Sequence, residues 1–493
     1  MKFVSTRGGD SIVSAGQAIS YGIAENGGLY VPESFPKMSE NDFNKMLEYS
    51  YSERAAFVLS KYLSDYSFEA LVSACEKAYE SFDGDPAPLV KIDNGLYILE
   101  LFHGPTSAFK DIALTVLPYL LREGCDLNGI KEEVLILVAT SGDTGKAALE
   151  GFKNAKGIKI MVFYPSDGVS KMQKLQMQTQ EGDNVNVIGI KGNFDDCQTA
   201  VKQIFTNSEY KKLLKEKNVV LSSANSINFG RLAPQIAYYF SAYCDMVNSD
   251  QINIGDKVNF SVPTGNFGNI LAAYYAIQMG LPVNKLICAS NKNNILTDFF
   301  LSGVYDTNRT FYKTMSPSMD ILISSNLERL IFEINGRNSN QTLERMEELK
   351  TSGKYKISPE ERTKLSEVFY ANYCNEDNTV ETIYDFFEDY SYPLDTHTAV
   401  GVSAYESYKH DTKDKTPTVI VSTASPYKFS QDVLYAITGN DVNDSFKASK
   451  RLYTATAMPI PDNLLQLKEK SVRFEETAER EKIFDKVLEF IQK

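Results

Sequence analysis

Short runs of apolar residues recur along the chain, and each is followed by a polar or glycine-rich loop and then by a helix-like segment. The runs are continuous rather than alternating, which is typical of strands covered on both faces in a parallel sheet with crossover helices. We therefore predict an α/β fold with two mostly parallel, doubly wound sheets. The clearest strands are expected at 134–140, 158–164, 186–190, 257–263 and 418–423.

The first 90 residues have a different pattern. Apolar residues recur at helical spacing through 41–63, and DGDPAP at 83–88 has the composition of a linker. The charged stretch 338–380 is expected to form solvated helices. We expect four regions: a mainly helical N-terminal subdomain (1–90), an α/β domain with Lys110 and the SGDTG loop (91–250), an α/β domain with the TGNFGN loop and Thr423 (251–450), and a C-terminal tail with a helix (451–493).

The composition narrows the class of partner. The net charge of -13 argues against a nucleic-acid partner, because binding a phosphate backbone needs a basic face. No apolar stretch reaches the roughly 18 residues of a membrane span, and the segment MKFVSTRGGDSIVS contains no apolar leader. The six cysteines form no C-x-x-C pair, and the three histidines stand at no zinc-ligand spacing. We therefore predict a cytoplasmic protein with reduced thiols, no membrane span and no metal site.

Ligands of doubly wound sheets bind beyond the carboxyl ends of the strands, where loops meet helix N-termini. TGNFGN at 264–269 is such a loop, and Gly265 and Gly268 permit a close approach of the backbone to an anion. It does not match G-x-G-x-x-G, so a dinucleotide is not indicated. The loop is either a phosphate cradle or a tight turn that needs glycine.

SGDTG at 141–145 also lies between a predicted strand and a predicted helix, and it superficially resembles a nucleotide-binding P-loop. Thr140 stands where the first glycine is required, and Ala147 stands where a hydroxyl must bind magnesium, so an ATPase is disfavoured. Ser141, Thr144 and the backbone amides suit a carboxylate, unless the loop only caps the helix.

ELFHGPTSAFKD at 100–111 places a lysine at a predicted helix start. Ser107 is expected to cap this helix, which puts Lys110 in its first turn. The positive end of the helix dipole repels a cation there, and the apolar neighbours Phe109 and Ile112 desolvate it. Both effects lower the pKa of the ammonium group, as a Schiff-base lysine requires.

Two more loops carry candidate ligand groups. SSANSINFGRLAPQ at 222–235 combines Ser and Asn side chains with Arg231 and suits a phosphate or a carboxylate, or else forms a hydrogen-bonded loop with a helix N-cap. STASPYKFS at 422–430 ends a strand, and Thr423 there either bonds a ring nitrogen or caps the next helix.

Together these segments resemble the threonine synthase family, within the fold-type-II pyridoxal-phosphate enzymes, whose architecture is like that of tryptophan synthase β. The matching segments occur in order over residues 27–429: GGLYVP, ELFHGPTSAFKD, ATSGDTG, SANSIN, SVPTGNFGN, THTAVG and STASPYKF. The order of several specific motifs over most of the chain leaves little room for coincidence.

The resemblance implies a role for each matching residue. Lys110 is the catalytic lysine that forms the internal aldimine with pyridoxal 5'-phosphate, and Thr423 bonds the pyridine nitrogen. The cofactor's phosphate is held by Gly265, Asn266, Phe267, Gly268 and Asn269. The substrate's α-carboxylate is held by Ser141, Gly142, Asp143 and Thr144, with Asp143 facing the 3'-oxygen of the cofactor. The substrate phosphate is assigned to His103, Ser223, Asn225, Ser226, Asn228 and Arg231, with Ser170 and Gln173 in support.

The implied reaction converts O-phospho-L-homoserine and water to L-threonine and phosphate, with Lys110 as the base at Cα and Cβ. A phospho-lyase or threonine dehydratase-like enzyme and a non-catalytic relative are the alternatives. The complete SANSIN segment favours the synthase over a dehydratase, which has no substrate phosphate to bind. The pattern does not distinguish a monomer from a dimer.

Overall fold

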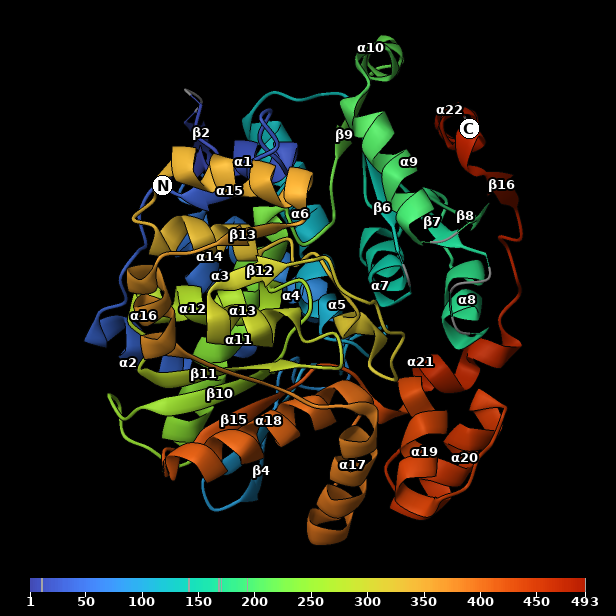
Figure 1. Cartoon of the computed structure of the whole chain (residues 1–493). Coiled ribbons are helices and arrows are strands. Elements are labelled where there is room, and N and C mark those ends of the chain that lie inside the picture. Colours follow the sequence, from blue (N-terminus) through green and yellow to red (C-terminus); the bar gives the residue numbers. More distant parts are fainter. Residues whose placement is uncertain (10–11, 141, 167–168, 170, 193, 493) are drawn as a thin grey trace.

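The computed structural model describes residues 1–492 except 10–11, 141, 167–168, 170 and 193. Two mostly parallel sheets form its centre, as the apolar runs predicted (Figure 1). Each of the five strands expected from the sequence is present within a residue or two of its predicted bounds.

The larger sheet has six strands in the order β14-β11-β10-β15-β5-β4. Only β4 is antiparallel to its neighbour; the other pairs are parallel. The strands are β4 (Leu89–Asp93), β5 (Leu96–Glu100), β10 (Val258–Pro263), β11 (Val283–Ser290), β14 (Phe369–Tyr373) and β15 (Thr418–Ser422).

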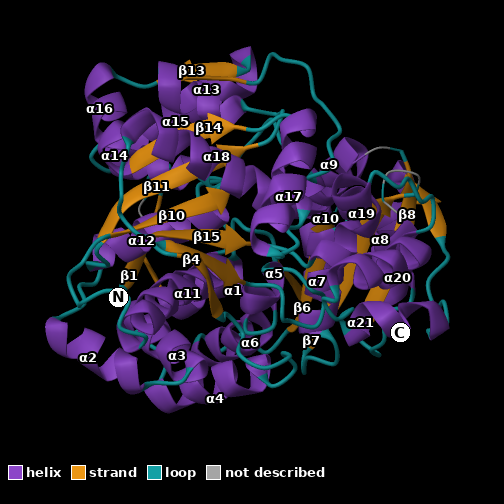
Figure 2. Ribbon diagram, turned by 90° about the horizontal axis from the view of Figure 1, so that it is seen from below, coloured by secondary structure: helices purple, strands orange, loops and turns teal. Residues whose placement is uncertain are grey.

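Helices cover both faces of the six-stranded sheet. One face packs on α11 (Phe229–Asn248) and α12 (Gly268–Met279), and the opposite face packs on α18 (Thr396–Thr412). Figure 2 shows α11 and α18 on opposite sides of this sheet. Alternate residues of β15 enter the two cores: Val419 and Val421 face one, and Ile420 faces the other. Both faces are therefore buried, which explains the unbroken apolar sequence of the strand.

The smaller sheet has five parallel strands in the order β16-β8-β7-β6-β9. They are β6 (Glu133–Ala139), β7 (Ile158–Pro165), β8 (Val185–Lys191), β9 (Val219–Ser222) and β16 (Thr477–Glu479). Its helices are α7 (Asp143–Phe152), α8 (Lys171–Gln178), α9 (Phe194–Thr206), α10 (Ser208–Glu216) and α22 (Ile483–Ile491). The C-terminal segment runs past α19 (Ser430–Thr438) and α20 (Ser445–Thr456) to reach the edge of this sheet (Figure 1).

The N-terminal region contains helices, as predicted, and also a small antiparallel sheet, β2-β1-β3. Its elements are β1 (Lys2–Ser5), β2 (Val13–Ser14), β3 (Tyr30–Pro32), α1 (Ala15–Tyr21), α2 (Glu40–Glu48), α3 (Tyr51–Tyr62) and α4 (Phe68–Tyr79). Serine capping boxes start α1, α2 and α3, which is why these helices begin where they do.

The charged stretch 338–380 forms the expected helices, and it also supplies two strands that its sequence did not reveal, β13 (Lys354–Lys356) and β14. The strand β14 pairs with β11 at the edge of the six-stranded sheet. The remaining elements are α13 (Ile295–Ser302), β12 (Val304–Asp306), η1 (Pro317–Met319), α14 (Leu327–Ile334), α15 (Ser339–Ser352), β13 (Lys354–Lys356), α16 (Pro359–Val368), α17 (Glu376–Tyr390), η2 (Pro426–Phe429), α19 (Ser430–Thr438), α20 (Ser445–Thr456), α21 (Asp462–Leu465), η3 (Gln466–Glu469) and η4 (Arg480–Lys482).

The sheets divide the chain differently from the four expected regions. Strands β4 and β5 precede those of the smaller sheet in sequence but belong to the larger sheet, and β16 returns from the C-terminal region to the smaller one. The domain boundaries taken from the sequence remain a prediction. Within the described ranges, no helix is long and apolar enough to cross a membrane.

Candidate active site

Lys110 is the first residue of the short helix α5 (Lys110–Leu114), which is followed by α6 (Leu117–Leu127). The expected capping by Ser107 is wrong. Ser107 has a left-handed backbone (φ 57°), and its hydroxyl donates to the Asn463 side chain at 3.1 Å. The loop is instead held by Asp111, whose carboxylate accepts from the amide and the hydroxyl of Thr106 at 2.8 and 2.6 Å.

The Lys110 ammonium group lies among polar groups from several elements. Its Nζ is 3.3 Å from the Ser318 hydroxyl and 3.7 Å from Asp143 Oδ2. Burial is the main cause that lowers the pKa of Lys110 to about 8, and the nearby cations Lys428 and Arg231 act in the same direction. The direction agrees with the sequence prediction. Burial rather than the dipole of a five-residue helix is its leading cause.

Asp143 is the shared partner of the polar groups around Lys110. It begins α7, and its Oδ1 lies 2.9 Å from Lys428 Nζ and accepts from Gln173 Nε2 at 3.3 Å. Burial alone would raise the pKa of the Asp143 carboxyl, but Lys428 first and Lys110 second hold that pKa well below its usual range. Asp143 is therefore a buried carboxylate that carries its charge.

The segment 314–320, which includes η1, closes the other side of Lys110. Ser318 donates from its hydroxyl to Asp143 Oδ2 at 3.2 Å and from its amide to His397 Nε2 at 3.1 Å. His397 Nδ1 in turn lies 3.0 Å from Asp395 Oδ1. Because a backbone amide only donates, His397 Nε2 must be the unprotonated nitrogen of the ring.

Sequence reasoning did not assign roles to Ser318, His397 or Lys428. His397 and Lys428 lie inside the motifs THTAVG and STASPYKF, so those motifs held a signal for them. Ser318 follows no strand and sits in no recognised motif, and only the fold brings it to Lys110.

The loop TGNFGN connects β10 to α12 and has the geometry of an anion cradle. A Cβ atom on Gly265 would lie 2.7 Å from the Ser318 carbonyl oxygen, so glycine is required there. Phe267 has a left-handed backbone (φ 63°) and precedes α12 without any side-chain cap. Asn269 accepts from two tyrosines of α11, while its Nδ2 is buried without a partner among the described residues. Unpaired donors at a helix N-terminus fit a phosphate group.

The residues of the SANSIN segment, 223–228, make different contacts in the fold. Asn228 caps α11 and uses its whole amide in the fold: Oδ1 accepts from the Gly230 amide, and Nδ2 donates to two carbonyl oxygens. Ser223 accepts from the Asn225 amide at 3.1 Å, and the carbonyl of Ser226 faces Arg329. Asn228 thus follows the N-cap interpretation that the sequence left open.

Arg231 is a buried cation on α11, and burial lowers its pKa to about 10. Its guanidinium donates to the Ala224 carbonyl at 3.0 Å, and within the described residues it forms no ion pair with a carboxylate. A buried guanidinium without a counter-charge is suited to bind an anion.

The contacts of the remaining expected site residues differ. Thr423 accepts from the Phe109 amide at 2.9 Å through its carbonyl, so the end of β15 touches the Lys110 loop. Gly142 and Thr144 flank Asp143 at the start of α7. His103 pairs with Glu100 at 2.7 Å and stacks on Phe102. Ser141 and Ser170 lie outside the described residues.

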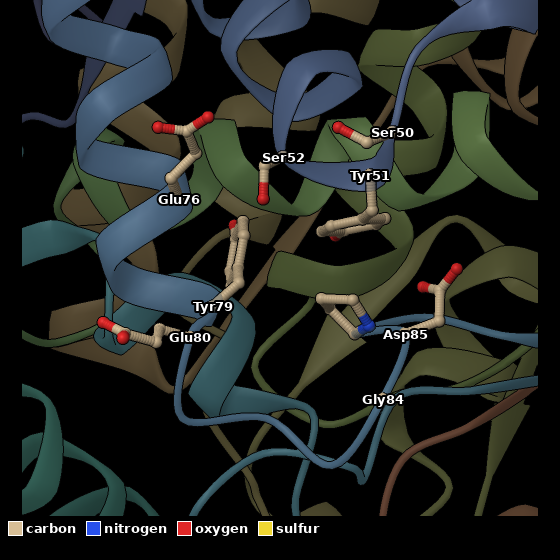
Figure 3. A pocket seen from close by; sticks show the side chains of 9 residues that line it. Ser50, Tyr51, Ser52, Glu76, Tyr79, Glu80, Gly84 and Asp85 are labelled. Carbon is tan, nitrogen blue, oxygen red and sulfur yellow. The ribbon is translucent and has the colours of Figure 1, made fainter.

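A hollow on the surface is lined by none of these residues. It lies between the start of α3 and the end of α4, and Figure 3 shows Glu76, Glu80 and Asp85 around it. Its carboxylates would repel a phosphate, so we place the site at Lys110 and not in this hollow.

The two mostly parallel sheets and the buried lysine are features of a class of enzymes. A family model described as "Pyridoxal-phosphate dependent enzyme" matches residues 81–424, and the chain belongs to that class. Models described as "Threonine synthase N terminus" and "Threonine synthase, C-terminal" match residues 2–79 and 398–491. The chain is a member of the threonine synthase family.

Relatives and solved structures agree with this assignment. The threonine synthase of Pseudomonas aeruginosa is 39% identical over 438 residues, which cover 88% of this chain and 90% of that protein. Human "Threonine synthase-like 1" is 39% identical over 454 residues, which cover 89% of this chain and 59% of that longer protein. The chain thus spans about 60% of the length of the four Threonine synthase-like 1 proteins it matches.

Two crystal structures share the whole fold. The structure described as "PLP bound Threonine synthase from Brucella melitensis" is 36% identical with a TM-score of 0.88, and it covers 100% of this chain and 99% of that one. Threonine synthase from yeast is 33% identical with a TM-score of 0.87, over 100% and 98% of the two chains.

Proposed function

We propose that this chain converts O-phospho-L-homoserine and water to L-threonine and phosphate, with pyridoxal 5'-phosphate as its cofactor. The observation that carries the proposal is Lys110. It is a buried lysine with a pKa near 8, it lies beside a charged carboxylate, and it belongs to a chain of the threonine synthase family. Such an amine is a base and a nucleophile near neutral pH.

The cofactor site is formed by groups from three strand ends. Lys110 would bond the cofactor's aldehyde carbon, the loop Gly265–Asn269 would hold its phosphate, and Thr423 would bond its ring nitrogen. Asn269 Nδ2, which has no partner among the described residues, and the start of α12 without a side-chain cap support the phosphate assignment. When bound, the cofactor supplies an electron sink that stabilises negative charge at the substrate carbons.

The substrate would lie between α7 and α11. The SGDTG loop would hold its carboxylate through Ser141, Gly142 and Thr144, while Asp143 would face the 3'-oxygen of the cofactor. Arg231 is the strongest candidate for its phosphate, because this buried cation has no carboxylate partner among the described residues. Ser223, Asn225 and Ser226 would line the same end of the site, Asn228 supports their loop as an N-cap, and His103 remains a candidate.

Lys110 would carry the protons of the reaction in turn. As a free amine it removes the proton from Cα and then one from Cβ, while phosphate leaves from Cγ and a proton is returned to Cγ. Water then adds its hydroxyl to Cβ, and Cα receives a proton. The sum consumes one water and releases one phosphate, and Arg231 stabilises the charge of the departing group.

Incubation of the cofactor-loaded chain with O-phospho-L-homoserine tests this function. We expect threonine and phosphate in equal amounts. Formation of 2-oxobutyrate with phosphate would support the phospho-lyase or dehydratase-like alternative. A chain that releases neither product would be a non-catalytic relative.

The catalytic role of Lys110 is tested by Lys110→Ala. We expect loss of the visible absorption band of a lysine-bound cofactor and a fall in threonine formation of at least about 10³-fold, because both the covalent anchor and the base are removed. Absorption spectra and product assays measure the two effects.

Lys146→Ala is the matched control, since Lys146 is also buried but pairs with Glu150 along α7. We expect this variant to keep the band. A band that persists in Lys110→Ala would refute the assignment of Lys110.

A further inference from the structure

Two buried lysines face one carboxylate in the candidate site. Lys428 Nζ lies 2.9 Å from Asp143 Oδ1, whereas Lys110 Nζ lies 3.7 Å from Asp143 Oδ2. The side chain of Lys428 is only 2% exposed, so water screens this pair poorly. Asp143 is therefore held mainly by Lys428.

Lys428 also binds the loop that carries Lys110. Its Nζ donates to the Thr106 carbonyl at 2.9 Å, four residues before Lys110. Lys428 itself lies in η2, the next element after β15. One ammonium group thus links the end of β15 in the larger sheet, the Lys110 loop, and the start of α7 on the smaller sheet.

We propose that Lys428 is a positioning residue that occupies the Asp143 carboxylate and thereby leaves Lys110 available as a reactive amine. The inference rests on the proposed role of Lys110 and deepens it. Lys428 does this through Asp143 and the Thr106 loop and needs no contact with the substrate.

The charges around Lys110 explain why one extra cation decides its state. Asp143 from α7 and Asp111 from α5 favour the ammonium form, while Lys428 from η2 and Arg231 from α11 disfavour it. Gln173 and Ser318 also bond Asp143, and His397 Nε2 accepts from the Ser318 amide. Without Lys428, the charged Asp143 would have Lys110 as its nearest cation and would hold it protonated.

The reactivity of Lys110 in the cofactor-free, full-length chain tests the proposal. Acetic anhydride acylates free amines, and the acylated Lys110 peptide is quantified by mass spectrometry between pH 6 and 11. We expect a midpoint near pH 8 in the parent chain and in Lys428→Arg. We expect Lys428→Met to shift the midpoint upward by at least about one unit, which lowers the rate at pH 7 by about tenfold.

Two further variants keep the result interpretable. Asp143→Asn should move the midpoint in the opposite direction, because Lys110 then faces cations without its main counter-charge. Lys146→Met removes another buried, ion-paired lysine from α7 and should leave the midpoint unchanged. An unshifted midpoint in Lys428→Met, or equal shifts in Lys428→Met and Lys146→Met, would overturn the proposal.

This readout is independent of the reaction. It measures an amine without cofactor or substrate, so a failure of the proposed threonine synthesis would leave it unaffected. Circular dichroism at each pH shows whether a variant is folded. If Lys428→Met does not fold, Lys428→Gln and the Asp143→Asn shift decide the outcome.

Discussion

At the residue scale, Gly265 shows how closely the site is packed. The segment 314–320 passes so near that an added Cβ would meet the Ser318 carbonyl oxygen at 2.7 Å, and a backbone atom cannot rotate away. By contrast, a Cβ on Gly268 would meet nothing closer than 3.5 Å. Two glycines of one motif therefore serve different purposes.

Replacing Gly265 by Ala is expected to lower the free energy of unfolding by about 1–3 kcal/mol, because the backbone must shift to relieve the overlap. Gly268→Ala is expected to cost less, since it adds a methyl group at a helix start with ordinary contacts. Denaturant unfolding of the two cofactor-free variants measures the difference. Equal losses would show that the close approach to Ser318 is unimportant.

The sequence identified much of the site at this scale, and its limits are physical. Lys110, Asp143 and Gly265 stood in motifs at predicted strand ends, and the structure brings all three within the reach of Ser318. Ser318 itself carries no local signal, because its contacts come from residues 175 and 208 positions away in sequence. The functional assignments of these residues stay predictions.

At the element scale, α3, α12 and α14 enclose a polar cluster inside the core. Glu333 of α14 is buried near the hydroxyls of Tyr62 and Tyr275, and both hydroxyls lack a partner among the described residues. Burial raises the pKa of Glu333 to about 7, although Arg337 at 3.2 Å opposes the rise. A carboxyl group with a raised pKa therefore lies where three helices pack together.

The sign of the pH effect follows from the raised pKa. A carboxyl that is protonated more readily in the folded state contributes stability below its ordinary value of 4.5, and this contribution is lost as pH rises through about 7. Between pH 5 and pH 8, we expect the unfolding free energy of Glu333→Gln to rise by about 2 kcal/mol relative to that of the parent. Unfolding free energies at both pH values measure this.

An exposed glutamate provides the comparison. The unfolding free energy of Glu347→Gln, on α15, should vary with pH as that of the parent does, because Glu347 faces water. If the curves of Glu333→Gln and the parent are also parallel, Glu333 does not titrate with folding.

At the scale of the whole molecule, the site depends on both sheets. Lys110, Gly265 and Lys428 follow strands β5, β10 and β15 of the larger sheet, while Asp143 follows β6 of the smaller one. The smaller sheet is completed by β16 from the C-terminal region, and α22 covers it with Ile483, Phe484, Val487 and Phe490.

Ending the chain at Phe474 should therefore weaken the smaller sheet. The truncation removes β16 and four buried apolar side chains, each worth about 1.5–3 kcal/mol of burial. We expect faster proteolysis within 133–222, mapped by mass spectrometry, while 258–290 stays protected. Glu489→Ala, an exposed change on α22, should keep the parent's pattern. An unchanged pattern after truncation would mean that the sheet is stable without β16.

The sequence by itself determined the fold class and the family. Parallel strands that are buried on both faces have unbroken apolar sequences. The loops at their ends contain the glycines and polar residues that a ligand site needs. These are local signals, and the α/β fold and the threonine synthase resemblance are both confirmed.

Only the tertiary structure decided which side chains meet. The pairs Lys428 with Asp143, and His397 with Ser318, join residues far apart in sequence, so no local pattern could reveal them. The same holds for β4 and β5 joining the larger sheet and β16 joining the smaller one. The physical reason is that a pairing energy depends on distance and burial, and the folded chain alone sets both.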